Sequence, residues 1–188
     1  MTPALIVVTG APGSGKSTIA GPLAARLGLP LIAKDELKEA LWDHLGPGDR
    51  ELFHAYGRVS YALMFLIARM LLRSRGSAVV EGNFTPEWAA DELEQLRGET
   101  PFRLVQVLCL ADPATCIARY RERAGSDARH PMHRAGGEEA DASVERRLRE
   151  GLWKRPIPLE GALFRVDTNE PVDIDALADE IAPMLREA

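Results

Sequence analysis

Residues 4–8 read Ala-Leu-Ile-Val-Val, and residues 10–17 read Gly-Ala-Pro-Gly-Ser-Gly-Lys-Ser. An apolar run that ends at a glycine-rich turn is typical of a buried strand in a parallel sheet. The second segment has the spacing GxxxxGK[ST] of a phosphate-binding loop (P-loop), whose backbone NH groups surround a triphosphate. A helix expected to begin near Lys16 adds its positive dipole end. The two segments therefore predict a strand, a loop and a helix that together bind a nucleoside triphosphate.

Two side chains of the loop have roles that the pattern itself assigns. Lys16 is expected to reach the β- and γ-phosphates, and the Ser17 hydroxyl is expected to be a ligand of Mg²⁺. The alternative is a glycine-rich turn that only precedes a helix, but strand, loop, lysine and hydroxyl follow in the order that phosphate binding requires. We therefore expect the nucleotide to contact Gly10, Ala11, Pro12, Gly13, Ser14, Gly15, Lys16, Ser17 and Thr18.

Length and composition limit the classes of protein to consider. The chain has 188 residues, 46% of them hydrophobic, and a formal net charge of -5. These values suit a single α/β domain over residues 1–188 with a substantial core. The acidic balance argues against a broad nucleic-acid footprint, although a strand end could still be a substrate. Cys109 and Cys116 are too few for a disulfide framework, and their spacing fits no common metal motif. Cys109 is expected to be a buried thiol.

The expected location follows from where the apolar segments lie. The P-loop strand begins within a few residues of Met1, so no signal peptide is expected before it. The longest apolar stretch, residues 61–72, is interrupted by Arg69. These features predict a cytoplasmic protein with no membrane span. Residues 61–72 could be buried within the domain or at a dimer face, so both a monomer and a homodimer fit the sequence.

Apolar runs of strand length alternate with helical patterns along the chain. Such alternation predicts a three-layer P-loop fold, an α/β class in which helices cover both faces of a five-stranded parallel sheet. Gly28 is placed to end the first helix in a left-handed cap. The expected strands are 4–8, 29–33, 78–80, 104–110 and 162–166, and the expected helices are 15–27, 35–45, 50–75, one that starts at Asp112-Pro113, and 173–186.

An arginine-rich lid is expected after the fourth strand and its helix. The sequence between Gly125 and Gly137 is poor in aliphatic residues and rich in Arg, His and Gly, which suits a mobile segment over about residues 125–142. Arg119 and Arg123 lie one helical turn apart before it, so both guanidinium groups can face the nucleotide. The alternative is a solvated basic helix face, which is the role expected for Arg121, Arg146, Arg147 and Arg149.

Two carboxylates are predicted at strand ends, where open parallel sheets bind ligands. Asp35 follows the second expected strand and could act as the general base for an acceptor hydroxyl. The alternative is that Asp35 only caps its helix, and one residue could do both. Glu81 ends the third expected strand, two residues before Asn83. Glu81 is expected to hold a magnesium-bound water or an acceptor hydroxyl.

The P-loop, Asp35, the Glu81-Gly82-Asn83 stretch and the paired arginines before a lid together resemble a small P-loop kinase with an AAA-type ATPase-like core. The pattern is similar to the group that holds polynucleotide 5'-hydroxyl kinases, zeta-toxin-like sugar-nucleotide kinases, chloramphenicol phosphotransferases and gluconate kinases. The resemblance covers nearly the whole chain. It implies a five-stranded parallel core, MgATP as the phosphoryl donor, and an acceptor hydroxyl or phosphate held opposite it.

The resemblance also implies roles for single residues. Arg119 is expected near adenine, and Arg123 or Arg129 near the β- and γ-phosphates. Residues 129–133 read Arg-His-Pro-Met-His, where the resembling lids often read Arg-His-Pro-Gly-His. Thr168 belongs to an Asp-Thr-Asn stretch similar to the loop that brackets adenine. Lys38 stands where polynucleotide kinases usually carry Arg, so the charge is kept but bidentate phosphate recognition is lost.

Three functions are therefore open from the sequence. The preferred one is an ATP- and Mg²⁺-dependent kinase for a hydroxyl of a small molecule, in which Lys38 and Asn83 join Asp35 and Glu81 on the acceptor side. The first alternative is a polynucleotide or nucleotide kinase, which would need cations around the acceptor cleft. The second alternative is an ATP-dependent switch or binding module that transfers no phosphate to a small acceptor.

Overall fold

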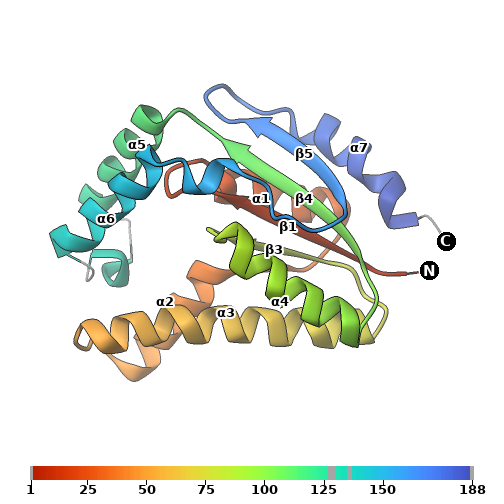
Figure 1. The fold of residues 1–188 in the computed structure, drawn as a ribbon, viewed down its shortest axis with the longest axis horizontal. Coiled ribbons are helices and arrows are strands. Elements are labelled where there is room, and N and C mark those ends of the chain that lie inside the picture. Colours follow the sequence, from red (N-terminus) through yellow and green to blue (C-terminus); the bar gives the residue numbers. More distant parts are fainter. Residues whose placement is uncertain (1, 127–129, 135–136, 187–188) are drawn as a thin grey trace.

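A five-stranded parallel sheet forms the centre of the fold (Figure 1). The computed structural model describes residues 2–126, 130–134 and 137–186. The strand order is β2-β3-β1-β4-β5, which places the P-loop strand β1 in the middle. The P-loop therefore leaves the sheet at the centre of its carboxyl edge. The strands are β1 (Ala4–Gly10), β2 (Leu31–Ala33), β3 (Ala78–Gly82), β4 (Arg103–Leu110) and β5 (Ala162–Asp167).

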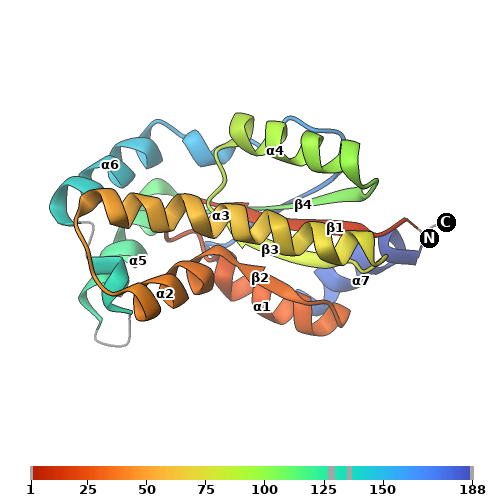
Figure 2. The same ribbon diagram turned by 90° about the horizontal axis from the view of Figure 1, so that it is seen from below.

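Helices cover both faces of this sheet, as the alternating pattern predicted. Successive side chains of a strand point to opposite faces. Leu5 and Val7 of β1 accordingly pack with α3 (Arg50–Arg73) and α4 (Pro86–Glu99). Ile6 and Val8 pack on the other side, with α1 (Lys16–Leu27) and α7 (Ile174–Arg186). Figure 2 shows α3 lying lengthwise along its face of the sheet, beside α2 (Lys34–Leu45) and α4.

The remaining helices lie at the carboxyl edge of the sheet, around the P-loop. They are α5 (Pro113–Gly125), α6 (Gly137–Arg149) and two short 3₁₀ helices, η1 (Pro131–Arg134) and η2 (Leu152–Lys154). The predicted lid region holds η1 and the first part of α6. The sequence reading did not predict α6 as a helix, because it has few apolar residues, with acidic residues towards its start and arginines in its last turn.

Most predicted boundaries are confirmed within two residues. Gly28 ends α1 with a φ of 66°, in the left-handed conformation expected of a C-cap glycine. The alternative that Asp35 only caps its helix is wrong: the N-cap is Ala33, no side chain makes a capping hydrogen bond, and Asp35 lies inside the first turn of α2. The carboxylate of Asp35 is therefore available to the site.

Helix α3 explains the long apolar stretch of the sequence. Within the described ranges it is the one helix whose length and composition would let it cross a membrane, a test that core helices also pass. Met64, Phe65, Ala68 and Leu72 of α3 are buried in the core. Leu66 and Met70 on its opposite side are exposed. The apolar composition of α3 thus has a structural reason within this fold.

Candidate active site

The backbone of the P-loop is fixed from two sides. Gly13 has a φ of 79°, and a Cβ added to it would lie 2.2 Å from the carbonyl oxygen of Cys116 in α5. Only glycine avoids both the left-handed strain and this collision. On the other side, the Thr168 hydroxyl donates a hydrogen bond to the Ser14 carbonyl oxygen at 2.7 Å. The loop is held in shape before any ligand binds.

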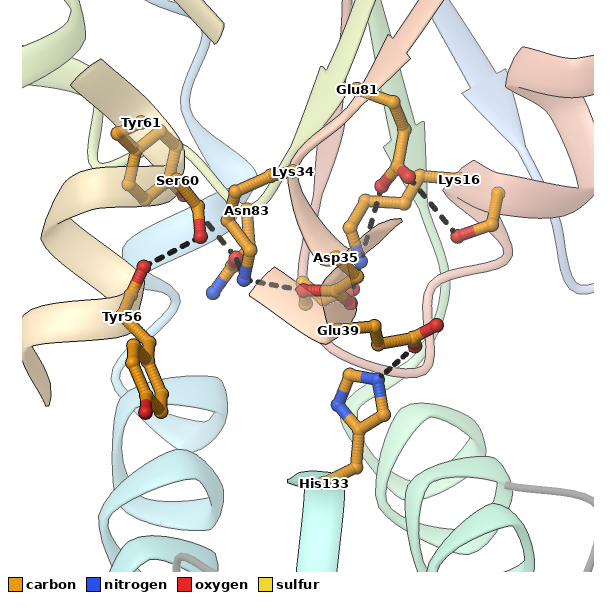
Figure 3. Close-up of polar contacts among 12 residues, drawn as sticks. Lys16, Lys34, Asp35, Glu39, Tyr56, Ser60, Tyr61, Glu81, Asn83 and His133 are labelled. Atoms are coloured by element: carbon orange, nitrogen blue, oxygen red, sulfur yellow. Dashed lines mark hydrogen bonds and ion pairs between the residues drawn. The ribbon is translucent and has the colours of Figure 1, made fainter. Parts of the chain in front are cut away.

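Glu81 lies where three strand ends meet. In the parallel register it is level with Val8 of β1 and with Ala33 of β2, the strands that lead to the P-loop and to Asp35. The Lys16 ammonium is 3.8 Å from Glu81 Oε1, and the Ser17 hydroxyl donates to Glu81 Oε2 at 3.3 Å (Figure 3). Burial raises the pKa of Glu81, while the nearby Lys16 lowers it.

Ser17 and Glu81 fit the predicted magnesium ligands, because Mg²⁺ prefers oxygen ligands and usually keeps several waters. No cluster of three or more His, Cys, Asp or Glu side chains that could hold a metal ion occurs in the described part of the chain. An ion here would therefore share its coordination with phosphate oxygens and water.

Asp35 lies opposite this group, at the start of α2. Its carboxylate forms an ion pair with Lys34, whose ammonium also donates to Asn83 Oδ1 at 3.3 Å (Figure 3). Burial acts to raise the pKa of Asp35, but the charges of Lys34 and Lys16 outweigh it and hold that pKa well below its usual range. Asp35 is consequently ionised at neutral pH. In the ligand-free protein it is a good hydrogen-bond acceptor and a weak base.

Lys38 lies one helical turn beyond Asp35 and is buried, with 8% of its surface exposed. Its ammonium stands 3.4 Å from the centre of the Phe53 ring of α3, in cation–π geometry. Burial, and then the charge of Lys34, lower the pKa of Lys38 to about 8.

Helix η1 contacts α2 through two histidine–carboxylate pairs. His133 Nε2 is 2.6 Å from Glu39 Oε1 (Figure 3), and His130 Nε2 is 2.9 Å from Asp43 Oδ1. The predicted lid region thus touches the acceptor side of the site. Arg129, a predicted phosphate contact, lies outside the described residues.

A cleft of about 900 Å³ joins these elements. Predicted site residues on its wall are Pro12, Gly13, Lys16, Ser17, Asp35, Lys38, Asn83 and Arg123. Lining residues that the sequence reading did not assign to the site include Arg50, Phe53, His54, Tyr120, Arg146 and Arg147. Arg146 and Arg147 are exposed, as expected of a solvated face, but they also line this cleft. Arg121 and Arg149, by contrast, form ion pairs with Glu145 outside it.

A second pocket, of about 530 Å³, adjoins the first through Gly13 and Arg123, which line both. It also contains Gly15, Thr18, Arg119 and Thr168. Arg119 donates a hydrogen bond to the Thr168 carbonyl oxygen at 2.9 Å. The two residues predicted near adenine are therefore neighbours, on the side of the P-loop away from Asp35.

Comparison with known proteins identifies relatives over nearly the whole chain. The sequence profile of the AAA domain family matches residues 5–146, which is more than half of the chain. The crystal structure of a candidate kinase from Chloroflexus aurantiacus J-10-fl is 32% identical, with a TM-score of 0.89 over 99% of this chain and 100% of that chain. No curated protein sequence matches.

More distant solved structures share the fold. The APS kinase of Mycobacterium tuberculosis, in complex with AMPPNP and APS, is 18% identical, with a TM-score of 0.58 over 99% of each chain. A gluconokinase from Sinorhizobium meliloti 1021 is 18% identical, with a TM-score of 0.54 over 98% of this chain and 91% of that chain. Their identity is too low to carry more than the fold.

Proposed function

This chain belongs to the AAA domain family and is related to the small P-loop kinases, and on that premise we propose that it transfers the γ-phosphate of ATP to a hydroxyl of a small molecule. The observation that carries the proposal is one cleft lined by Lys16, Ser17 and Asp35. A phosphate-binding loop alone would serve a switch or a motor equally well. An ionised carboxylate across the cleft from Lys16 gives a place for an acceptor hydroxyl.

On the nucleotide side, Lys16 would exchange its present contacts for phosphate oxygens. It now donates to the Ala11 carbonyl oxygen at 3.4 Å and lies near Glu81. The second pocket, with Arg119 and Thr168, would take the nucleoside, and Arg123 at the boundary would stabilise charge on the transferring group. When bound, Mg²⁺ would be held by Ser17 and Glu81 and would neutralise phosphate charge.

On the acceptor side, Asp35 would accept a hydrogen bond from the hydroxyl and aim its oxygen at the γ-phosphorus. A bond forms between that oxygen and phosphorus while the bond to the β-phosphate oxygen breaks, and ADP leaves. The hydroxyl proton passes to Asp35 and then to solvent. Phosphates that neutralise Lys16 would remove one of the charges that depress the pKa of Asp35. ATP binding would thereby make Asp35 a better base.

The proposal is tested by ADP release from MgATP with a panel of hydroxyl compounds, for the wild type, Lys16→Ala and Asp35→Ala. One compound should stimulate ADP release in the wild type, and neither variant should respond to it. Equal product formation by Asp35→Ala and the wild type would show that the acceptor assignment is wrong.

The basic lining of the cleft favours one alternative acceptor, a polynucleotide or nucleotide. Transfer of radiolabelled phosphate from ATP to the 5' end of an oligonucleotide would support it. A kinase for small molecules should give no labelled oligonucleotide.

A further inference from the structure

The outer side of α3 carries an apolar stripe that the described part of the chain leaves exposed. Val59, Leu66 and Met70 expose 43%, 46% and 62% of their surface, and Ala62 between them is also exposed. Their spacing of three and four residues places them along one side of the helix. In Figure 2, α3 lies in front of the sheet, with α2 on one side and α4 on the other. A contiguous exposed stripe, unlike a single exposed side chain, indicates a contact surface.

The two ends of this stripe carry opposite charges. Glu51 lies in the first turn of α3 and Arg73 in the last. In the part of the chain that the structure describes, Glu51 is exposed and forms no ion pair. Arg73 and Arg69 share one carboxylate, that of Glu99, at 3.6 and 3.2 Å, so this end keeps an excess of positive charge. Glu51, Ala62 and Arg73 are spaced by eleven residues, which is close to three full turns, so all three lie on the same side of α3.

We infer that the outer side of α3 binds the same side of a second copy of this chain, with the two helices antiparallel and a two-fold axis at Ala62. A two-fold interface requires a surface that is complementary to itself. The equal spacing on either side of Ala62 places Glu51 of each copy opposite the partner's Arg73. The small side chain of Ala62 allows the helix axes to approach to about 8 Å. Leu66 would lie against the partner's Arg58, whose aliphatic stem can cover it while the guanidinium stays in water.

The charges favour a second copy over a lipid surface. Helices that bind anionic membranes carry Lys and Arg along their polar border, whereas this stripe has a carboxylate at one end and belongs to a chain with a net charge of -5. One helix from each copy forms an interface near the low end of the stable size range, so we expect a dissociation constant on the order of micromolar. None of the described residues of the stripe lines the 900 Å³ cleft, so the contact can be removed without altering the site.

The test is sedimentation equilibrium of the full chain over about 1 to 200 µM, a range that brackets micromolar dimerisation. The proteins are the wild type, Leu66→Glu, Glu51→Arg, Arg73→Glu and the double variant that combines the last two changes. Glu180→Arg is the matched control, because Glu180 is exposed on α7, which covers the other face of the sheet. AMPPNP binding by each variant shows that it is folded.

The wild type and Glu180→Arg should form dimers with the same dissociation constant. Glu51→Arg and Arg73→Glu should each raise it about fivefold to thirtyfold, because two ion pairs per dimer are lost and like charges face each other. The double variant should recover most of this loss, since exchanging the two charges restores the pairs. Leu66→Glu should stay monomeric over the whole range, because it places a carboxylate in the apolar centre of the contact.

Three results would overturn the inference. The first is a wild type that is monomeric at the highest concentration, including one that instead binds phosphatidylserine vesicles through Leu66. The second is a dimer whose dissociation constant is the same in Leu66→Glu, which would place the contact on another face. The third is a double variant that dimerises more weakly than either single variant, which would exclude the antiparallel pairing of Glu51 with Arg73. The proposed kinase function survives each of these results.

Discussion

Replacing Lys38 with Met is expected to make the protein more stable at neutral pH, although we expect it to weaken acceptor binding. Burial and Lys34 lower the pKa of Lys38 from 10.5 to about 8. Each pKa unit corresponds to about 1.4 kcal/mol, so the charged lysine costs the folded state up to about 3 kcal/mol. The lost cation–π contact with Phe53 offsets about 0.5–2 kcal/mol of this gain. The expected net stabilisation is about 1–3 kcal/mol at pH 7.

The stability difference between Lys38→Met and the wild type should depend on pH. Between pH 8 and 10.5 the unfolded chain keeps the Lys38 proton while the folded protein releases it. Wild-type stability should therefore rise through this window relative to the variant. The advantage of Lys38→Met should be full below pH 8 and should shrink as the pH approaches 10.5.

The assay is urea unfolding of the wild type, Lys38→Met and Lys154→Met at pH 7 and at pH 10, with the midpoint and slope fitted separately. Lys154→Met should differ little from the wild type at either pH, because Lys154 is exposed. A Lys38→Met protein that is less stable than the wild type at pH 7 would refute the burial argument. So would a stability difference that stays the same at pH 10.

Four further changes test other parts of the site. Gly13→Ala should weaken AMPPNP binding at least tenfold and lower the melting temperature, because its Cβ would collide with the Cys116 carbonyl; Gly21→Ala is the control, since its Cβ meets nothing within 4 Å. Asp35→Asn should lower kcat about 10²- to 10⁴-fold with little change in the KM for MgATP, and an unchanged kcat would contradict the acceptor role. Because the pKa of Asp35 is held low, kcat/KM of the wild type should not fall at the pH where an ordinary Asp is protonated. A fall in kcat/KM near pH 4 that is absent in Asp35→Asn would contradict the ion pair between Asp35 and Lys34. Glu81→Gln should raise the Mg²⁺ concentration needed for half-maximal activity. If the variant and the wild type need the same Mg²⁺ concentration, Glu81 is not a ligand of the metal.

The fold and the nucleotide side could be predicted because their signals are local. The P-loop residues are contiguous, and the left-handed glycines and the strand before them belong to the same short segment. The alternation of apolar strands with helices likewise indicates a parallel sheet without any knowledge of distant contacts. The carboxyl ends of parallel strands share one edge, so Asp35 and Glu81 could be assigned to the site from their positions alone.

Other parts of the site depend on contacts between distant segments. Arg146 and Arg147 looked like a solvated face because nothing near them in the sequence reveals that α6 turns them toward the cleft. Asp35 was expected to be a general base, and its pKa is held low first by the adjacent Lys34 and then by Lys16, which reaches it from another element.

The sequence by itself determined that the chain has a P-loop at the centre of a parallel sheet, since both follow from local spacing and periodicity. Only the tertiary structure decided that Lys38 is buried against the Phe53 ring and that the pKa of Asp35 is held below its usual range. The physical reason is that burial and Coulomb interactions depend on distances in space, and α2, α3 and the P-loop come together only when the chain is folded.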